Sequence, residues 1–273
     1  MKKLRIFVAA LIMIALTACE EPVEWQLQTS GNRYLIVESV ITNENKQQEV
    51  LLHFSAEMLN EKPEPVSGAV VKVSDGTQVF SFSESPDAAG RYVSDESFIA
   101  VVNRIYYLQT EYSGTTYTAR SFMVPVADFQ PVSYIKITED TCRIDNIPPA
   151  FSPVENAMHE ILIDWSHLPD YADSSADKTK ILRYYYTLSS LDVPEFFAPQ
   201  VAEIQFPAGA LIRHRKYSLT PEHAAFIRSM LIETQWRGGF FDSEHGNIES
   251  NLSEGALGFF GACSVIEKET EAW

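Results

Sequence analysis

Short runs of alternating apolar and polar residues recur about every ten residues between Tyr34 and Ser121, and turn-forming residues separate them. The run from Tyr34 to Thr42 is rich in β-branched residues, and Asp75-Gly76 lies between two such runs as a strong hairpin signal, because glycine accepts a positive φ. Alternation of period two places successive side chains on opposite faces of a strand. This part of the chain has no helical period, and its pattern predicts a β-sandwich.

The alternation continues in the second half of the chain, most clearly from His159 to Trp165 and from Ile181 to Leu188. One helix is predicted at residues 221–236, because Thr220 can cap it, proline suits its first position and apolar residues then repeat at helical spacing. The predicted fold class is therefore all-β. We expect two β-sandwich-like domains, the first immunoglobulin- or transthyretin-like and the second carrying this amphipathic helix.

The first 18 residues and Cys19 after them have the pattern of a lipoprotein signal peptide. A cationic start, Met1 to Arg5, precedes an apolar run from Ile6 to Leu16. This run is shorter than the roughly 20 residues that a membrane-spanning helix needs. It reads as a signal peptide, and Leu16-Thr17-Ala18-Cys19 reads as a lipobox, so we expect cleavage before Cys19 and a membrane anchor through acyl chains on that residue. The alternative is an ordinary secretory peptide with an incidental cysteine.

Removal of the leader leaves 255 residues, enough for two domains of ordinary size. The predicted organisation is a signal peptide at 1–18, an acidic tether at 19–33, an N-terminal domain at 34–128 and a C-terminal domain at 129–273. The leader carries three positive charges and no acid, so the formal charge moves from −16 to −19. Such an acidic surface repels phosphate backbones, and nucleic acid is not an expected partner.

Two cysteines remain besides the anchor, Cys142 and Cys263. Disulfides persist outside the reducing cytosol, so a disulfide between them is one expectation. Two buried free thiols are the other, because separation along the chain does not give distance in space. Neither cysteine has the spacing of a metal or redox site.

The sequence offers few groups for catalysis. None of its histidines has a ligand-pair spacing, and Asp242-Ser243-Glu244-His245 fits a solvated turn better than a metal site, since adjacent loop residues seldom converge on one ion. No nucleophile elbow and no phosphate-binding glycine loop are present. We therefore predict no metal, no cofactor and no catalytic residue. Paired carboxylates of a hydrolase stay open as an alternative, because their separation is spatial.

Aromatic residues are the best candidates for a binding surface, because aromatic side chains are enriched at interface cores. Tyr184, Tyr185 and Tyr186 lie on both sides of one predicted strand, and Phe196 and Phe197 lie in a predicted loop. We expect Tyr184 and Tyr186 to fill the core. The candidate binding surface is Tyr185 with Phe196 and Phe197.

The chain resembles a family of Bacteroidota lipoproteins catalogued as domain of unknown function 4249. The matching segments, in the order the family has them, are Tyr34 to Glu38, Ile41 to Asn43, Pro65 to Val73, Gly90 to Tyr92, Tyr106 to Leu108, Tyr117, Ala119, Gly246 to Asn251 and Gly255 to Phe260. Glycine in the last of these segments suggests a strand packed closely against another backbone. The resemblance implies no established enzymatic activity. It implies an accessory role beside TonB-dependent outer-membrane transporters.

Acidic residues directly after Cys19, Glu20 and Glu21, resemble the export signal of surface lipoproteins in the same bacteria. We therefore expect a non-enzymatic lipoprotein, anchored in the outer membrane and facing the cell surface, that binds a TonB-dependent barrel, its cargo, or both. One alternative is a stand-alone lipoprotein that binds a glycan or a peptide. The other is a hydrolase.

Overall fold

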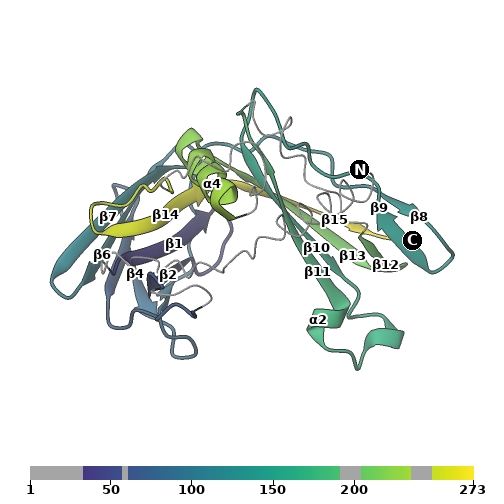
Figure 1. The fold of residues 1–273 in the computed structure, drawn as a ribbon, viewed down its shortest axis with the longest axis horizontal. Coiled ribbons are helices and arrows are strands. Elements are labelled where there is room, and N and C mark those ends of the chain that lie inside the picture. The colour runs from purple at the N-terminus through teal and green to yellow at the C-terminus, as the bar shows by residue number, and fades with distance from the viewer. Residues whose placement is uncertain (1–32, 57–60, 191–203, 235–247) are drawn as a thin grey trace, which may run out of the picture. The chain divides into compact units, whose positions relative to one another are not determined.

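The computed structural model describes residues 33–56, 61–190, 204–234 and 248–273, and within these ranges it confirms the all-β prediction (Figure 1). The described residues form sheets of eight, four and three strands. Along the eight-stranded sheet the order is β14 (Ala256–Cys263), β1 (Leu35–Thr42), β2 (Glu49–Phe54), β5 (Arg91–Ser94), β4 (Val79–Glu84), β3 (Val70–Ser74), β6 (Ile105–Tyr112) and β7 (Thr115–Phe122).

The other two sheets come from the second half of the chain. The four-stranded sheet has the order β11 (Lys180–Thr187), β10 (Ala157–Asp164), β13 (Leu211–Ser218) and β15 (Val265–Glu271). The three-stranded sheet has the order β12 (Gln205–Pro207), β9 (Thr141–Ile144) and β8 (Tyr134–Lys136). The helices are η1 (Pro169–Tyr171), α2 (Ala176–Thr179) and α4 (Pro221–Thr234). Among the described residues, none of these helices has the length and apolar character needed to cross a membrane.

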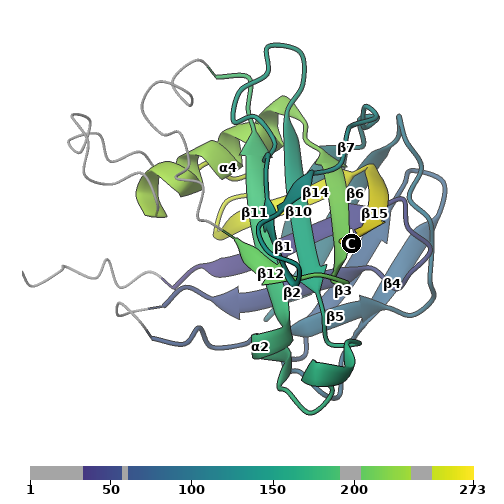
Figure 2. The same cartoon turned by 90° about the vertical axis from the view of Figure 1, so that its right-hand side faces the viewer.

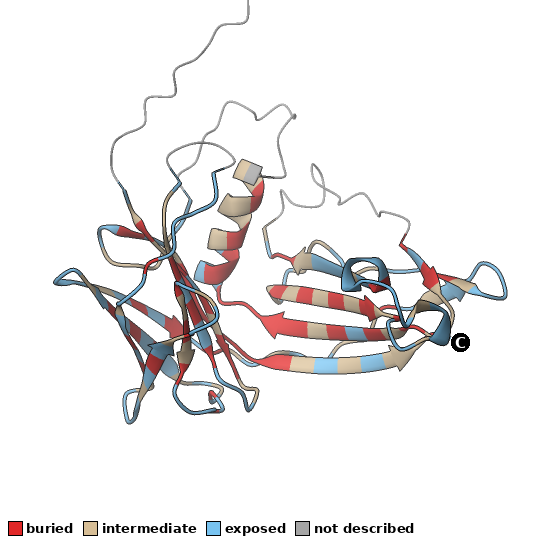
Figure 3. Ribbon diagram, turned by 90° about the horizontal axis from the view of Figure 1, so that it is seen from below, coloured by how far each residue is buried: buried red, intermediate tan, exposed pale blue. Residues whose placement is uncertain are grey.

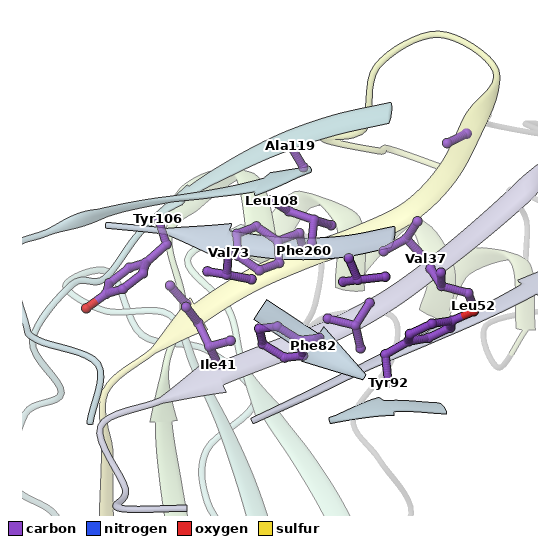
Figure 4. Close-up of a cluster of buried hydrophobic side chains, with 14 of the residues drawn as sticks. Val37, Ile41, Leu52, Val73, Phe82, Tyr92, Tyr106, Leu108, Ala119 and Phe260 are labelled. Carbon is purple, nitrogen blue, oxygen red and sulfur yellow. The ribbon is translucent and has the colours of Figure 1, made fainter. Parts of the chain in front are cut away.

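The eight-stranded sheet curls until its two ends meet. Val124, just after β7, forms a parallel bridge to Cys263 at the end of β14, and the Ala262 amide donates to Ser121 Oγ at 3.0 Å. Apolar side chains from strands on both sides fill the interior, among them Val37 and Phe260, each fully buried (Figure 4). The two-faced alternation predicted from the sequence is what supplies these inward side chains.

Strand β14 joins this sheet although it belongs to the last part of the chain. It pairs in parallel with β1, from Leu35 opposite Ala256 to Thr42 opposite Cys263. Gly258 has φ +102°, and a Cβ there would lie 2.1 Å from the carbonyl oxygen of Val37, so only glycine allows the close approach that the sequence suggested. The predicted division near residue 128 stays a prediction, and strand pairing crosses it at β14.

Helix α4 begins where it was predicted and covers the outer face of β14 (Figure 2). Thr220 Oγ1 accepts a hydrogen bond from the His223 amide at 3.2 Å, which confirms the predicted cap. The His223 and Phe226 rings stack on the Phe259 ring, with centroid separations of 4.4 and 5.0 Å. The helix is described to Thr234, and the last two residues of the predicted range, 235–236, lie outside the described residues.

A single residue, Ser264, separates β14 from β15, so one stretch of chain passes from the eight-stranded to the four-stranded sheet (Figure 1). Asn43 fixes the start of β15, because its Oδ1 accepts from the Val265 amide at 2.7 Å and its Nδ2 donates to the Val265 carbonyl at 3.4 Å. A buried apolar cluster around Tyr217, Ile227 and Cys263 packs at the same junction. Hydrogen bonds and apolar burial therefore both tie the two sheets together.

Candidate functional site

One face of the four-stranded sheet carries a regular array of charged and aromatic side chains. Strand register places Tyr184, Glu160, Arg215 and Glu267 in one row across β11, β10, β13 and β15, and Leu182, Leu162, Arg213 and Glu269 in the next. We call these eight residues the open face. Tyr184 and Leu182 are 46% and 44% exposed, whereas residues of the opposite face pack into a core, an alternation visible as bands along the strands (Figure 3).

Arg215 is the centre of the open face. Its guanidinium donates to Glu160 at 3.1 Å and to Glu44 at 2.5 Å, and Glu267 lies 3.5 Å from its Nε. Glu44 belongs to the loop between β1 and β2, so this ion pair spans the two sheets. The Arg215 side chain is only 16% exposed and lies over the Tyr217 ring, 5.0 Å from its centroid. The charges are therefore held in place, which favours recognition by shape and charge.

The ion pairs around Arg215 keep the Glu44 carboxylate ionised. Burial alone would raise the pKa of Glu44, but hydrogen bonds from Lys46 and Thr42 and the charge of Arg215 hold that pKa below its ordinary value. Burial and the Glu160 carboxylate raise the pKa values of the Tyr184 and Tyr217 hydroxyls. Both hydroxyls therefore stay protonated at neutral pH and can donate hydrogen bonds.

A shallow hollow of about 410 Å³ lies on the neighbouring outer face of β1 and β2. Val40 and Leu51 give it an apolar floor, and Glu38, Lys46 and Glu49 surround them. Lys46 Nζ donates to Glu44 Oε2 at 2.9 Å, which connects the hollow to the open face through the same carboxylate that holds Arg215. The candidate site is this combination of hollow, ion-pair array and exposed tyrosine.

A histidine pair lies on the covered face of the same sheet. The Val132 amide donates to His214 Nδ1 at 3.1 Å, so neutral His214 carries its proton on Nε2 and donates to His159 Nδ1 at 3.0 Å. His159 is left with its proton on Nε2, directed at Thr187 Oγ1 at 3.4 Å. Thr187 in turn donates to the Pro149 carbonyl at 2.6 Å. The chain of hydrogen bonds has one direction and requires both rings to be neutral.

Burial keeps both rings neutral. Removal from water, with the positive charge of Lys216 nearby, lowers the pKa of His159 to about 3 and that of His214 to about 4. No local pattern indicates this pair, because the two histidines lie on different strands and meet only through the β10–β13 register. The pair is a buried network in which the Nδ1 atoms of both rings already accept hydrogen bonds.

The Cys263 thiol lies 3.7 Å from His223 Nδ1, which resembles the pairing of a nucleophile with a base. Burial, however, raises the pKa of Cys263 to about 12 and lowers that of His223 to about 4. A thiolate–imidazolium pair is therefore strongly disfavoured. The contact belongs to the packing between α4 and β14.

Of the predicted binding residues Tyr185, Phe196 and Phe197, the structure describes Tyr185. Tyr185 packs against the core cluster on the covered face, half-buried, and Phe196 and Phe197 lie outside the described residues. Tyr184, which we expected in the core, is instead exposed on the open face, so that expectation is wrong. Period-two alternation shows that adjacent tyrosines point in opposite directions, but it does not show which direction is inward.

Of the two alternatives for Cys142 and Cys263, the disulfide is wrong, since both residues are buried free cysteines. Cys142 lies in the core under the four-stranded sheet, and Cys263 lies in the cluster next to α4. The two thiols belong to separate packing clusters. The second alternative, two buried thiols, therefore describes the structure.

Two other sequence features lie outside the described residues: the anchor residue Cys19 and the turn Asp242 to His245. Within the described ranges, no group of three or more His, Cys, Asp or Glu side chains is arranged to hold a metal ion. The acids of the open face are engaged by arginines instead.

A family model described as Domain of unknown function (DUF4249) matches residues 20–269, which is most of the chain. A comparison with curated proteins found no match.

Proposed function

The chain belongs to the family described as Domain of unknown function (DUF4249), and from this premise we propose that it is a non-enzymatic lipoprotein, anchored in the outer membrane through Cys19, that binds a partner in the envelope. The partner we propose is a TonB-dependent outer-membrane barrel, to which this protein is an accessory at the cell surface. The observation that carries the anchor is the lipobox Leu16-Thr17-Ala18-Cys19 after an apolar run too short to span a bilayer.

The open face supports binding as the activity. It combines an exposed tyrosine and an exposed leucine with ion pairs whose geometry is fixed by strand register. Rigid aromatic side chains contribute contact area at low entropic cost, and fixed charges select a complementary partner. A lipid anchor would confine this face to a thin layer at the membrane and so raise the effective concentration of a weakly binding partner.

A Cys19→Ala variant tests the anchor. We expect it to move from the membrane fraction to the soluble fraction and to lose incorporation of labelled palmitate, with thermal unfolding unchanged. Thr17→Ser keeps a small residue ahead of the cysteine and serves as the matched control, which should stay in membranes. A Cys19→Ala protein that still fractionates with membranes would count against the acyl anchor.

Detergent co-purification tests the partner. A double variant of the open face, Leu182→Ser with Tyr184→Ser, changes two exposed side chains and should reduce recovery of a TonB-dependent barrel. Val79→Ser, also exposed but on the eight-stranded sheet, is the control and should leave recovery unchanged. Equal recovery with all three proteins would remove the open face as the contact surface.

The exposed ring of Tyr184 also favours a second candidate, a stand-alone lipoprotein that captures a glycan or a peptide. Binding of such a ligand by the full chain in detergent, without any barrel, would support it. Loss of that binding in Tyr184→Ser would assign it to the open face.

A further inference from the structure

A second hollow, of about 420 Å³, lies on the outer face of the eight-stranded sheet, away from the open face. Its floor is two cross-strand pairs of outward side chains, Tyr107 opposite Arg120 and Gln109 opposite Thr118, on β6 and β7. Its wall is the segment from Asn251 to Ser253. We call this site the Arg120 hollow.

The wall is held rigidly by hydrogen bonds to the sheet. Asn251 Nδ2 donates to the carbonyls of Arg120 and Phe260 at 3.1 and 2.8 Å, and its Oδ1 accepts from the Phe260 amide at 3.0 Å. Ser253 adds two more, since its amide donates to the Thr118 carbonyl at 2.8 Å and its Oγ accepts from the Thr118 amide at 3.0 Å. The wall is therefore formed before any ligand arrives, which lowers the entropic cost of binding against it.

The guanidinium of Arg120 is unusual in this acidic protein. Within the described ranges it makes no hydrogen bond or ion pair, while Arg213 and Arg215 on the open face are both engaged by carboxylates. An arginine at the floor of a hollow whose guanidinium is not engaged by a carboxylate can receive one from a ligand through two parallel hydrogen bonds. The hollow therefore favours a ligand that carries a carboxylate.

The other side chains of the hollow indicate what the rest of the ligand must be. Tyr107 is 45% exposed and offers a ring on which the apolar face of a sugar can stack, beside the Arg120 guanidinium. Gln109 and Thr118 supply an amide and a hydroxyl, each able both to donate and to accept hydrogen bonds. An array of one arginine, one aromatic ring and several neutral polar groups matches a sugar with many hydroxyls and one acidic group.

We propose that the Arg120 hollow binds a carboxylate-bearing saccharide, such as a uronic acid unit of an acidic polysaccharide. Arg120 binds the carboxylate, Tyr107 packs against the sugar ring, and Gln109 and Thr118 bind hydroxyls. This site requires neither the anchor nor the open face, so the proposal stands or falls separately from the proposed function.

The test is calorimetry on the full chain in detergent, with trigalacturonate as the probe and the neutral galactose trimer as comparison. We expect trigalacturonate to bind and the neutral sugar to bind at least about tenfold more weakly, because charged hydrogen bonds to the carboxylate are lost. Arg120→Gln should weaken trigalacturonate binding by a similar factor while leaving the neutral sugar unaffected. Tyr107→Ala should weaken both.

The control is Lys136→Gln, which removes one exposed positive charge from the three-stranded sheet and should change neither affinity. Unchanged thermal unfolding of each variant shows that a loss of binding is local. The proposal is overturned if trigalacturonate fails to bind at millimolar concentration, if Arg120→Gln binds it as well as the unmodified protein, or if a short peptide with a free carboxyl end binds at Arg120 more tightly than the sugar.

Discussion

His159 Nδ1 accepts a hydrogen bond from His214 Nε2 at 3.0 Å while the Val132 amide donates to His214 Nδ1, and the two bonds together require both imidazoles to be neutral. The rings lie on neighbouring strands under the four-stranded sheet, with the Phe129 ring 4.5 Å from that of His214 between centroids. The neutral state of two buried rings is thus part of what stabilises this sheet, and it makes stability depend on pH in a definable window.

Acidification from pH 6.5 to 4.5 should destabilise the protein. The pKa values of His159, His214 and His223 are lowered to about 3, 4 and 4, so in this window the unfolded chain takes up protons that the folded chain does not. Each ring should then lower the free energy of unfolding by at most about 1.4 kcal/mol per pH unit, a slope approached near pH 5 and about half as large at pH 6.5, where the unfolded histidine is half protonated. Urea unfolding at several pH values measures the slope.

His223→Phe is the matched variant for this prediction. It keeps a ring stacked on Phe259 and removes one of the three titrating groups. The pH slope between 6.5 and 4.5 should fall by the contribution of one ring. A slope that does not change would show that His223 takes up its proton in the folded state as readily as in the unfolded state.

Gly258→Ala should destabilise the fold strongly. The φ of +102° is strained for alanine, and its Cβ would overlap the Val37 carbonyl oxygen, far closer than van der Waals contact. We expect a loss of about 3 kcal/mol or more in the free energy of unfolding, measured by chemical denaturation. Gly76→Ala has a similar φ of +86° with no atom within 4 Å of the new Cβ, so it should cost only about 1 kcal/mol. Equal losses at both positions would contradict close packing of β14 on β1.

The Arg215–Glu44 ion pair should contribute measurable coupling between the sheets. A double-mutant cycle with Arg215→Met and Glu44→Gln should give a coupling energy of about 1–3 kcal/mol, because Arg215 is largely removed from solvent. The Arg91–Glu49 pair, whose side chains are 38% and 46% exposed, is the comparison and should couple far more weakly. If the two cycles agreed, the pair at the junction would be no stronger than a surface ion pair.

The thiols of Cys142 and Cys263 should be unreactive in the folded protein. Both are buried, and burial raises the pKa of Cys263 to about 12, so the thiolate needed for reaction is scarce. In a Cys19→Ala background, a thiol reagent should label neither cysteine under native conditions and both after unfolding without a reductant. Labelling that appears only after reduction would instead indicate a disulfide.

The sequence predicted the parts of this fold that depend on local pattern. The strand β1, the hairpin at Asp75-Gly76 and the start of α4 at Pro221 all lie where alternation, turn residues or capping indicated. These signals are local, because they depend on residues a few positions apart.

The pairing of strands from distant parts of the chain could not be read in this way. Nothing in the sequence near Glu160 or Arg215 indicates that they share a row with Tyr184, since this depends on the register of three strands. The same holds for His159 with His214. The candidate sites are built from such long-range neighbours, so the sequence supplied the chemical groups but not their grouping.

The parallel pairing of β1 with β14 sets an order on folding. Strand β1 has two neighbours, and one of them, β14, belongs to the last part of the chain. The fully buried Phe260 ring is part of β14. Contacts between such distant segments form slowly, since a long loop must close first. A chain that ends before residue 256 would leave one edge of β1 unpaired and the interior of the eight-stranded sheet without Phe260. Unpaired strand edges and exposed apolar interiors are the features that chaperones recognise. The eight-stranded sheet is therefore complete only once β14 has been synthesised.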